Sequence, residues 1–162
     1  MTLPVPPPQH FTGHLLRRAQ QAHLAAWAEH VSTTVSSVQF AALSVLARDP
    51  GRSQAALCAE LGLDRATIAD LVRRMETRGH VRRTPDPHDA RRKVVALTDA
   101  GHEAVRMLLP RVESLEPILT GRLTASERAR LRMLLERVVG AVTDEAAEVP
   151  GTKAGAEVGG PA

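Results

Sequence analysis

Apolar residues recur at intervals of three and four over most of the chain, and this spacing predicts a mainly helical protein. In the first periodic segment, for example, Leu16, Gln20, His23 and Trp27 fall on one face. Interruptions of the pattern divide the chain into six predicted helices, which cover approximately residues 10–31, 36–48, 53–61, 64–78, 98–119 and 124–143.

Local signals mark the ends of these helices. Ser36 with Gln39, and Thr124 with Glu127, have the spacing of a capping box. Proline-containing segments predict interruptions: Asp49-Pro50-Gly51 ends the second helix, and a kink or break is expected at Pro110 and at Pro117. The predicted N-caps are Ser53, Asp64 and Thr98, and the predicted C-caps are Gly62 and Gly79.

The helical pattern gives way to strands only between residues 79 and 98. Val81 to Thr84 and Lys93 to Leu97 are strand-like, and the turn-forming sequence PDPHDA follows the first of them. The third and fourth helices, joined by Gly62-Leu63, form a predicted helix-turn-helix. The fold class predicted is therefore mainly α with a small β-wing, a winged helix-turn-helix.

The domain organisation follows from the same pattern. Residues 1–9 contain four prolines and no periodicity, so we expect a disordered lead, and we expect residues 144–162 to form a flexible tail. Residues 10–143 suit a single domain, with the winged helix-turn-helix at about 36–98. The helices at about 10–31 and 98–143 have more apolar surface than so small a domain can cover, which predicts a dimerisation region and a homodimer.

Positive charge is concentrated in one part of the chain. The net charge is only +3, but residues 64–93 contain nine Arg or Lys against five acidic residues, so this segment carries +4 and the remainder −1. A local basic patch on a nearly neutral scaffold favours a polyanionic partner, and double-stranded DNA is the expected one.

Other classes of protein lack support in the sequence. His10 and His14 have helical spacing, but no Cys, Asp or Glu joins them at metal-ligand spacing, and there is neither a glycine-rich phosphate loop nor a nucleophile paired with a base. We therefore expect no enzyme, metal site or cofactor. The single Cys58 excludes an intrachain disulfide, and the absence of a signal peptide or of an apolar run of about 20 residues predicts a cytoplasmic protein with no membrane partner.

The basic segment also carries a family resemblance. The order D-R-A-T-I-x-x-L-V-R-R-M-E-x-x-G-x-V-R-R, followed by D-P-x-D-A-R-R-K-x-V-x-L-T-x-x-G, resembles the MarR/SlyA family of winged-helix repressors, and the similarity extends from about His14 to Val142. The resemblance implies a homodimeric transcriptional regulator with interleaved terminal helices. Such a dimer would present two reading helices to a palindromic operator whose half-sites lie about 10–10.5 base pairs apart.

The fourth helix is the expected reading helix. A helix in the major groove reaches base edges from its exposed N-terminal turns. Arg65 can bind guanine, Thr67 or Ala66 can contact a thymine methyl group, and Asp70 can accept from cytosine or orient Arg74. The alternative is that these side chains form only a solvated face. The predicted contacts are Arg65, Ala66, Thr67, Asp70, Arg73 and Arg74.

The turn of the wing supplies a second set of predicted DNA contacts. The resemblance suggests that Asp89 supports an arginine that enters the minor groove, with Arg91 the first choice and Arg92 the second. We expect His88 and Lys93 to contact phosphates, which positions the protein without reading sequence. A simple Asx turn is the alternative role for Asp89.

An effector site is predicted from Arg17, His23, Trp27 and Ser37. Arg can clamp a carboxylate, His and Ser can bond phenolic hydroxyls, and Trp supplies a flat apolar wall, so the set suits a small aromatic carboxylic acid. These residues resemble, in spacing, the ligand contacts of family members that sense hydroxylated aromatic acids such as protocatechuate. Arg17 and His23 lie about 120° apart around the helix, so Arg17 either wraps to the pocket or comes from the dimer mate.

The sequence also allows three alternatives. The effector residues can instead be core, interface and surface residues of a DNA-binding regulator that has no small-molecule ligand. Cys58 can be a peroxide sensor, although its position behind the reading helix suits a small buried residue. The basic wing can bind an acidic protein partner in place of DNA.

Overall fold

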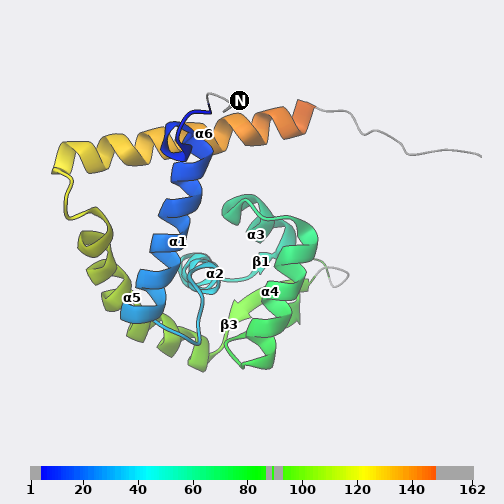
Figure 1. The fold of residues 1–162 in the computed structure, drawn as a ribbon. Helices are drawn as coiled ribbons and strands as arrows, with labels where there is room; N and C mark the ends of the chain where they lie inside the picture. The colour runs from blue at the N-terminus through cyan, green and yellow to red at the C-terminus, as the bar shows by residue number, and fades with distance from the viewer. Residues whose placement is uncertain (1–4, 87–88, 90–92, 149–162) are drawn as a thin grey trace, which may run out of the picture. The chain divides into compact units, whose positions relative to one another are not determined.

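The computed structural model describes residues 5–86, 89 and 93–148 (Figure 1). Its helical content and its small antiparallel sheet confirm the predicted fold class. The elements in chain order are η1 (Pro8–His10), α1 (Thr12–His30), α2 (Ser37–Arg48), β1 (Arg52–Ser53), α3 (Gln54–Leu61), α4 (Arg65–Thr77), β2 (Val81–Pro85), β3 (Lys93–Leu97), α5 (Asp99–Thr120) and α6 (Ala125–Glu148).

The helix ends follow the local signals in the sequence. Ser36 and Gln39 form both bonds of a capping box at the start of α2, and Thr124 and Glu127 do so before α6. After α4 the C-cap is Arg78, one residue earlier than predicted, and Gly79 follows with φ +75°. The N–H groups of Gly79 and His80 then donate to the carbonyls of Glu76 and Met75, which closes the helix as a Schellman motif.

The helix-turn-helix and the sheet form one unit. Strands β2 and β3 pair antiparallel from Val81 with Leu97 to Pro85 with Lys93, so they form the arms of the wing. The short strand β1 pairs with the other edge of β3, giving the order β1-β3-β2. The sequence did not predict β1, because a strand of two residues has no periodicity of its own and depends on a partner about 40 residues away.

A single core cluster ties these elements together. Ile68, Leu71, Val72 and Met75 form the buried stripe of α4, as their spacing predicts. They pack in one cluster with residues of α2, α3, β2 and β3, and Leu108 and Leu115 of α5 join it. At the junction of the wing and α5, Gly101 approaches the carbonyl of His80 so closely that an added Cβ would lie 2.0 Å from its oxygen.

Helix α5 continues through both of its prolines. A kink or break was expected at each; Pro110 and Pro117 lie inside the helix, so neither of them breaks it. Each proline removes one N–H donor, but the helix is anchored on both sides of Pro110 by the buried Leu108 and Leu115, and Ser114 Oγ donates to the Pro110 carbonyl at 2.8 Å.

The chain divides into two compact units, residues 1–119 and 120–162. In the second unit, α6 presents Leu131, Leu134, Leu135 and Val138 as exposed side chains, and no residue of it up to Gly140 is buried. Across the described part of the chain, no helix combines the length and the apolar character that a membrane crossing requires.

Candidate DNA-binding interface and adjoining pocket

Helix α4 has one buried and one exposed side, and the predicted reading residues lie on the exposed one. Arg65, Ala66, Thr67, Arg73 and Arg74 are exposed and Asp70 is half-buried. Because the apolar stripe fixes the rotation of the helix against the core, these side chains must point outward. The helix therefore presents three guanidinium groups to solvent.

Asp64 organises the first turn of α4. Its Oδ1 accepts from the Thr67 backbone N–H at 2.9 Å, and its Oδ2 accepts from the Thr67 hydroxyl at 2.5 Å. The Thr67 hydroxyl bond and the backbone bond lower the pKa of Asp64 below its ordinary value of 3.8. Since the Thr67 hydroxyl proton is committed to Asp64, the methyl group of Thr67 is the part left for apolar contact with a base.

Asp70 binds two of the arginines that we expect to contact DNA. Its Oδ1 accepts from Arg73 Nη2, and its Oδ2 lies 2.7 Å from Arg74 Nη2. The side chain of Arg73 remains 68% exposed and that of Arg74 56% exposed, so both can turn toward an incoming phosphate. Without DNA, one carboxylate thus holds two cations on the surface of the reading helix.

The described part of the wing includes two of its predicted contacts. Lys93 is exposed at the start of β3, and the N–H of Asp89 donates to the carbonyl of Asp86 at 3.3 Å, as in a tight turn. The remaining predicted wing contacts, His88, Arg91 and Arg92, lie outside the described residues, and so does the expected Asp89–Arg91 pairing.

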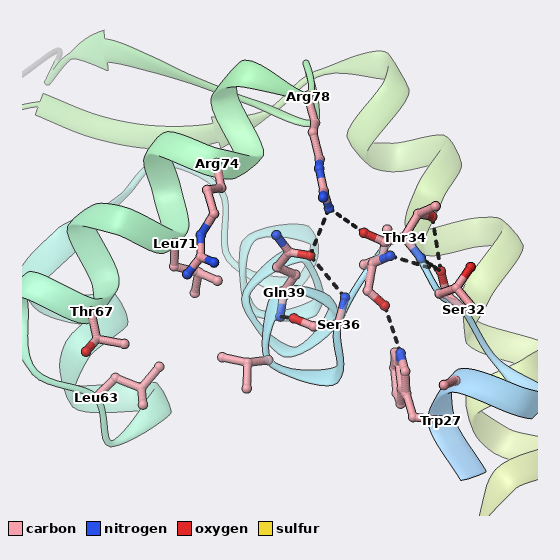
Figure 2. Close-up of a pocket in the computed structure, with 14 residues that line it drawn as sticks. Trp27, Ser32, Thr34, Ser36, Gln39, Leu63, Thr67, Leu71, Arg74 and Arg78 are labelled. Carbon is pink, nitrogen blue, oxygen red and sulfur yellow. Dashed lines mark hydrogen bonds between the residues drawn. The ribbon is translucent and has the colours of Figure 1, made fainter. Parts of the chain in front are cut away.

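A pocket of about 600 Å³ lies beside α4, on the side of the α1–α2 connection (Figure 2). Its apolar lining comes from Trp27, Val35, Val38, Leu63 and Leu71. Polar side chains also line the pocket, with hydroxyl, amide and guanidinium groups that belong to Ser32, Thr33, Thr34, Ser36, Gln39, Thr67, Arg74 and Arg78. The pocket thus combines apolar side chains with hydroxyl and guanidinium groups.

Of the four predicted effector residues, only Trp27 lines this pocket. Trp27 is buried, its indole N–H donates to the Val35 carbonyl at 2.7 Å, and its ring lies 6.0 Å from that of the half-buried His23. Ser37 is half-buried and does not line the pocket, whereas its neighbours Ser36 and Val38 do.

Arg17 lies on the exposed surface of α1, away from the pocket lining. Its guanidinium donates to Gln21 Oε1 at 3.0 Å and lies 3.4 Å from His14 Nδ1. Within one chain, therefore, the structure does not bring Arg17 together with Trp27 at the pocket.

Sequence reasoning missed Arg78, which reaches from the end of α4 into the pocket. Its Nη1 donates to the Thr34 carbonyl and to Gln39 Oε1, the latter at 3.3 Å (Figure 2). Thr34 is 44 residues away, so only the tertiary fold reveals the contact. The one available signal was a basic residue at the C-terminal end of a helix, which is commonly explained by the helix dipole alone.

Cys58 is half-buried, whereas its position in the sequence suggested that it would be fully buried. It packs against the core and also lines a second, smaller pocket with Gln54, Ala55 and Arg65. The part of the chain that the structure describes contains no group of three or more His, Cys, Asp or Glu placed to hold a metal ion.

Comparison with known proteins places this geometry in a family. A family profile described as MarR family matches residues 33–92. The transcriptional repressor NicR of Pseudomonas putida is 36% identical over 129 residues, which cover 78% of this chain and 81% of that protein.

Two solved structures extend the similarity to the fold. The PcaV transcriptional regulator of Streptomyces coelicolor, in complex with its natural ligand, has a TM-score of 0.83 at 36% identity and covers 86% of this chain and 99% of its own. BpsR of Bordetella bronchiseptica, whose DNA binding is regulated by 6-hydroxynicotinic acid, has a TM-score of 0.75 at 29% identity and covers 79% of this chain and 92% of its own. On this similarity in sequence and structure, the chain belongs to the MarR family of transcriptional regulators.

Proposed function

We propose that the chain is a homodimeric repressor that binds a palindromic operator and is released by a small aromatic carboxylic acid. The observation that carries the DNA-binding part is the exposed face of α4, where Arg65, Arg73 and Arg74 lie opposite a fully buried stripe. A rigidly oriented, basic helix next to a two-stranded wing suits insertion into the major groove, with the wing on the adjacent minor groove. The predicted contacts of the wing, Asp89 and Lys93 among them, belong to this proposal.

The proposed dimer accounts for apolar surface that the single chain leaves uncovered. Large apolar side chains are exposed on three helices: Leu15, Leu16 and Leu24 on α1, Met107, Leu109, Ile118 and Leu119 on α5, and Leu131, Met133, Leu134, Leu135, Val138 and Val139 on α6. Apolar surface of this extent is typical of an interface between subunits. Two-fold symmetry would then match the symmetry of a palindromic DNA site.

The pocket and two of the relatives support the aromatic acid. BpsR is regulated by 6-hydroxynicotinic acid, a ring with a carboxylate and a hydroxyl group, and PcaV was crystallised with its natural ligand. A volume of about 600 Å³ with an indole wall fits a molecule of that size. In this proposal Trp27 and the neighbouring His23 and Ser37 contribute to the effector site, and Arg17 reaches it from the second subunit.

The test of the DNA-binding part is a titration of the protein with the DNA that flanks its own gene, over a series of salt concentrations. Because arginine–phosphate contacts release counterions, the proposal predicts affinity that falls steeply as salt rises, and a weaker salt dependence for Arg65→Ala or Arg73→Ala. Arg106→Ala on α5 is the control, since Arg106 is paired with Glu103 away from the reading helix. An affinity insensitive to salt would remove the DNA-binding proposal.

The effector part has a separate test. Hydroxylated benzoates and 6-hydroxynicotinate are added to the protein–DNA complex, and release of the DNA is measured. The proposal predicts release by at least one of these acids. If none of them releases the protein at millimolar concentration, the aromatic-acid part is wrong and a regulator without a small-molecule ligand is the better description.

A further inference from the structure

We propose that Glu76 is a positioning residue of the DNA-binding surface, because its carboxylate fastens the outer strand of the wing, β2, to the last turn of the reading helix α4. In consequence Arg83, one of the basic residues of segment 64–93, holds the wing in place and does not itself contact DNA. The inference rests on the DNA-binding part of the proposed function and is independent of the effector.

Glu76 makes two contacts with the wing, and both reach the same residue. Its Oε1 accepts from the Arg83 backbone N–H at 3.3 Å, and its Oε2 lies 3.3 Å from Arg83 Nε. The second contact is an ion pair, since the buried Nε is not aligned for a hydrogen bond with any group in the described part of the chain. One carboxylate thus binds the backbone and the side chain of Arg83, which fixes the strand more closely than a side-chain pair alone.

The strand that receives this contact has an outer edge. In the order β1-β3-β2, strand β2 pairs only with β3, so the N–H groups on its other side have no partner in the described sheet. Arg83 donates one of them to Glu76. Two residues earlier, Val81 is buried in the core cluster together with Met75 of α4. Apolar packing at Val81 therefore holds the base of β2, and the Glu76 contact extends the attachment by two residues along the strand.

Exposure separates Arg83 from the arginines that remain available to DNA. Its side chain is only 30% exposed, whereas Arg73 and Arg74 keep more than half of theirs in solvent. Its neighbour Arg82 is exposed, because successive side chains of a strand point to opposite faces. Arg83 is turned back toward α4, where Glu76 balances its charge, so the ion pair would have to break before this guanidinium could meet a phosphate.

A fixed wing matters because the reading helix and the wing enter adjacent grooves of the same duplex. Both can bind only if their separation matches the DNA, and a two-stranded wing is only marginally stable by itself. Holding β2 against α4 in the free protein removes part of the ordering cost of binding. Glu76 should thus raise the affinity for an operator, although its negative charge alone opposes DNA.

The sign of the effect of Glu76→Ala decides between positioning and charge. Alanine removes both contacts and suits a helix, and the side chain it replaces is 41% exposed, so the variant should fold. If Glu76 acted only through its charge, its removal would strengthen binding to any duplex. If it positions the wing, the affinity for the DNA that flanks the gene should fall about fivefold, and the affinity for scrambled DNA should not fall.

Glu103→Ala is the matched control. It removes the same charge and also breaks a carboxylate–arginine pair, but on α5. It should show no loss of affinity that is specific to the flanking DNA.

Arg83→Gln and the double variant Glu76→Ala/Arg83→Gln test the role of the arginine. Because both changes break the same contact, the double variant should bind the flanking DNA about as well as Glu76→Ala alone. A direct phosphate contact by Arg83 would instead make the double variant weaker than Glu76→Ala. It would also flatten the plot of log affinity against log salt by about 0.9.

Hydroxyl-radical footprinting of the full-length protein on the flanking DNA separates a displaced wing from general weakening. At saturating protein, Glu76→Ala should lose the protection of the minor groove beside each half-site and keep the protection that α4 gives within it. A general loss of stability would lower both in parallel.

Unchanged or tighter binding of Glu76→Ala to the flanking DNA would overturn the inference and leave the DNA-binding proposal intact. Additive losses in the double variant, or a parallel loss of all protection, would do the same. A wild type that binds the flanking DNA no better than scrambled DNA would instead refute the proposed DNA binding, and this inference with it.

Discussion

Replacing Asp70 with Asn tests how the reading helix controls its own positive charge. In the free protein Asp70 holds Arg73 and Arg74 in exposed ion pairs. Exposed pairs of this kind contribute only about 0–1 kcal/mol each, so releasing the arginines should cost the fold little. The same carboxylate would lie near the phosphates of bound DNA, which it repels.

The size of the effect follows from Coulomb's law for a carboxylate placed beside the phosphate backbone. A carboxylate at roughly 7 Å from a phosphate is repelled by about 0.6 kcal/mol in water, so two nearby phosphates amount to about 1 kcal/mol, or a factor of roughly five in affinity. Each arginine that is freed to bind a further phosphate should steepen the plot of log affinity against log salt by about 0.9. For Asp70→Asn we therefore expect roughly fivefold tighter binding to random-sequence DNA at low salt, and a smaller ratio of specific to non-specific affinity.

The assay is fluorescence anisotropy with operator and scrambled duplexes over a range of salt concentrations. Glu103→Gln is the matched control, because it also removes one negative charge and also breaks an i,i+3 pair with arginine, but on α5. The reasoning is refuted if Asp70→Asn leaves the affinity and the salt slope for scrambled DNA unchanged. A gain of the same size in Glu103→Gln would mean that net charge matters and the position of Asp70 does not.

Two further predictions concern the scaffold that holds the reading helix. Gly101→Ala should lower the free energy of unfolding by about 1–3 kcal/mol in urea denaturation, because its Cβ would meet the backbone oxygen of His80 at 2.0 Å. Gly13→Ala is the control: its Cβ would have no atom within 4 Å, so it should change the free energy of unfolding by less than about 0.5 kcal/mol. Equal stability of the two variants would contradict the close approach of Gly101 to His80. Asp64→Ala should lower the thermal midpoint of unfolding at neutral pH. Because the folded-state pKa of Asp64 is depressed, the difference in midpoint from wild type should be complete above about pH 4 and should shrink as the pH falls through the lowered pKa. A difference that grows on acidification would show that Asp64 does not cap α4 as a carboxylate.

The parts of the fold that depend on neighbouring residues could be predicted from the sequence. The capping boxes at Ser36 and Thr124 and the N-cap at Asp64 each involve residues three positions apart, so the pattern of letters contains the whole interaction. The buried stripe of α4 follows for the same reason, because helical periodicity determines which side chains share a face.

The pocket could not be predicted in this way. It is formed by side chains from α1, the α1–α2 connection, α2 and α4, and its link between Arg78 and Thr34 spans 44 residues. Arg17 was predicted to clamp the carboxylate from its residue type and from the family resemblance, and within one chain its guanidinium donates to Gln21, one helical turn away. Only the tertiary structure shows that Arg74 and Arg78 are the arginines lining the pocket of a single chain.

The central claim is that a MarR-family reading helix binds DNA and is released by an aromatic acid. The most direct measurement is the affinity of the full-length protein for the DNA beside its own gene, with and without a hydroxybenzoate, at several salt concentrations. The account predicts binding that is tighter than to scrambled DNA, weakens steeply with salt and is lost when the acid is added. Binding that is equal for both DNAs, or specific binding that no aromatic acid relieves, would contradict it.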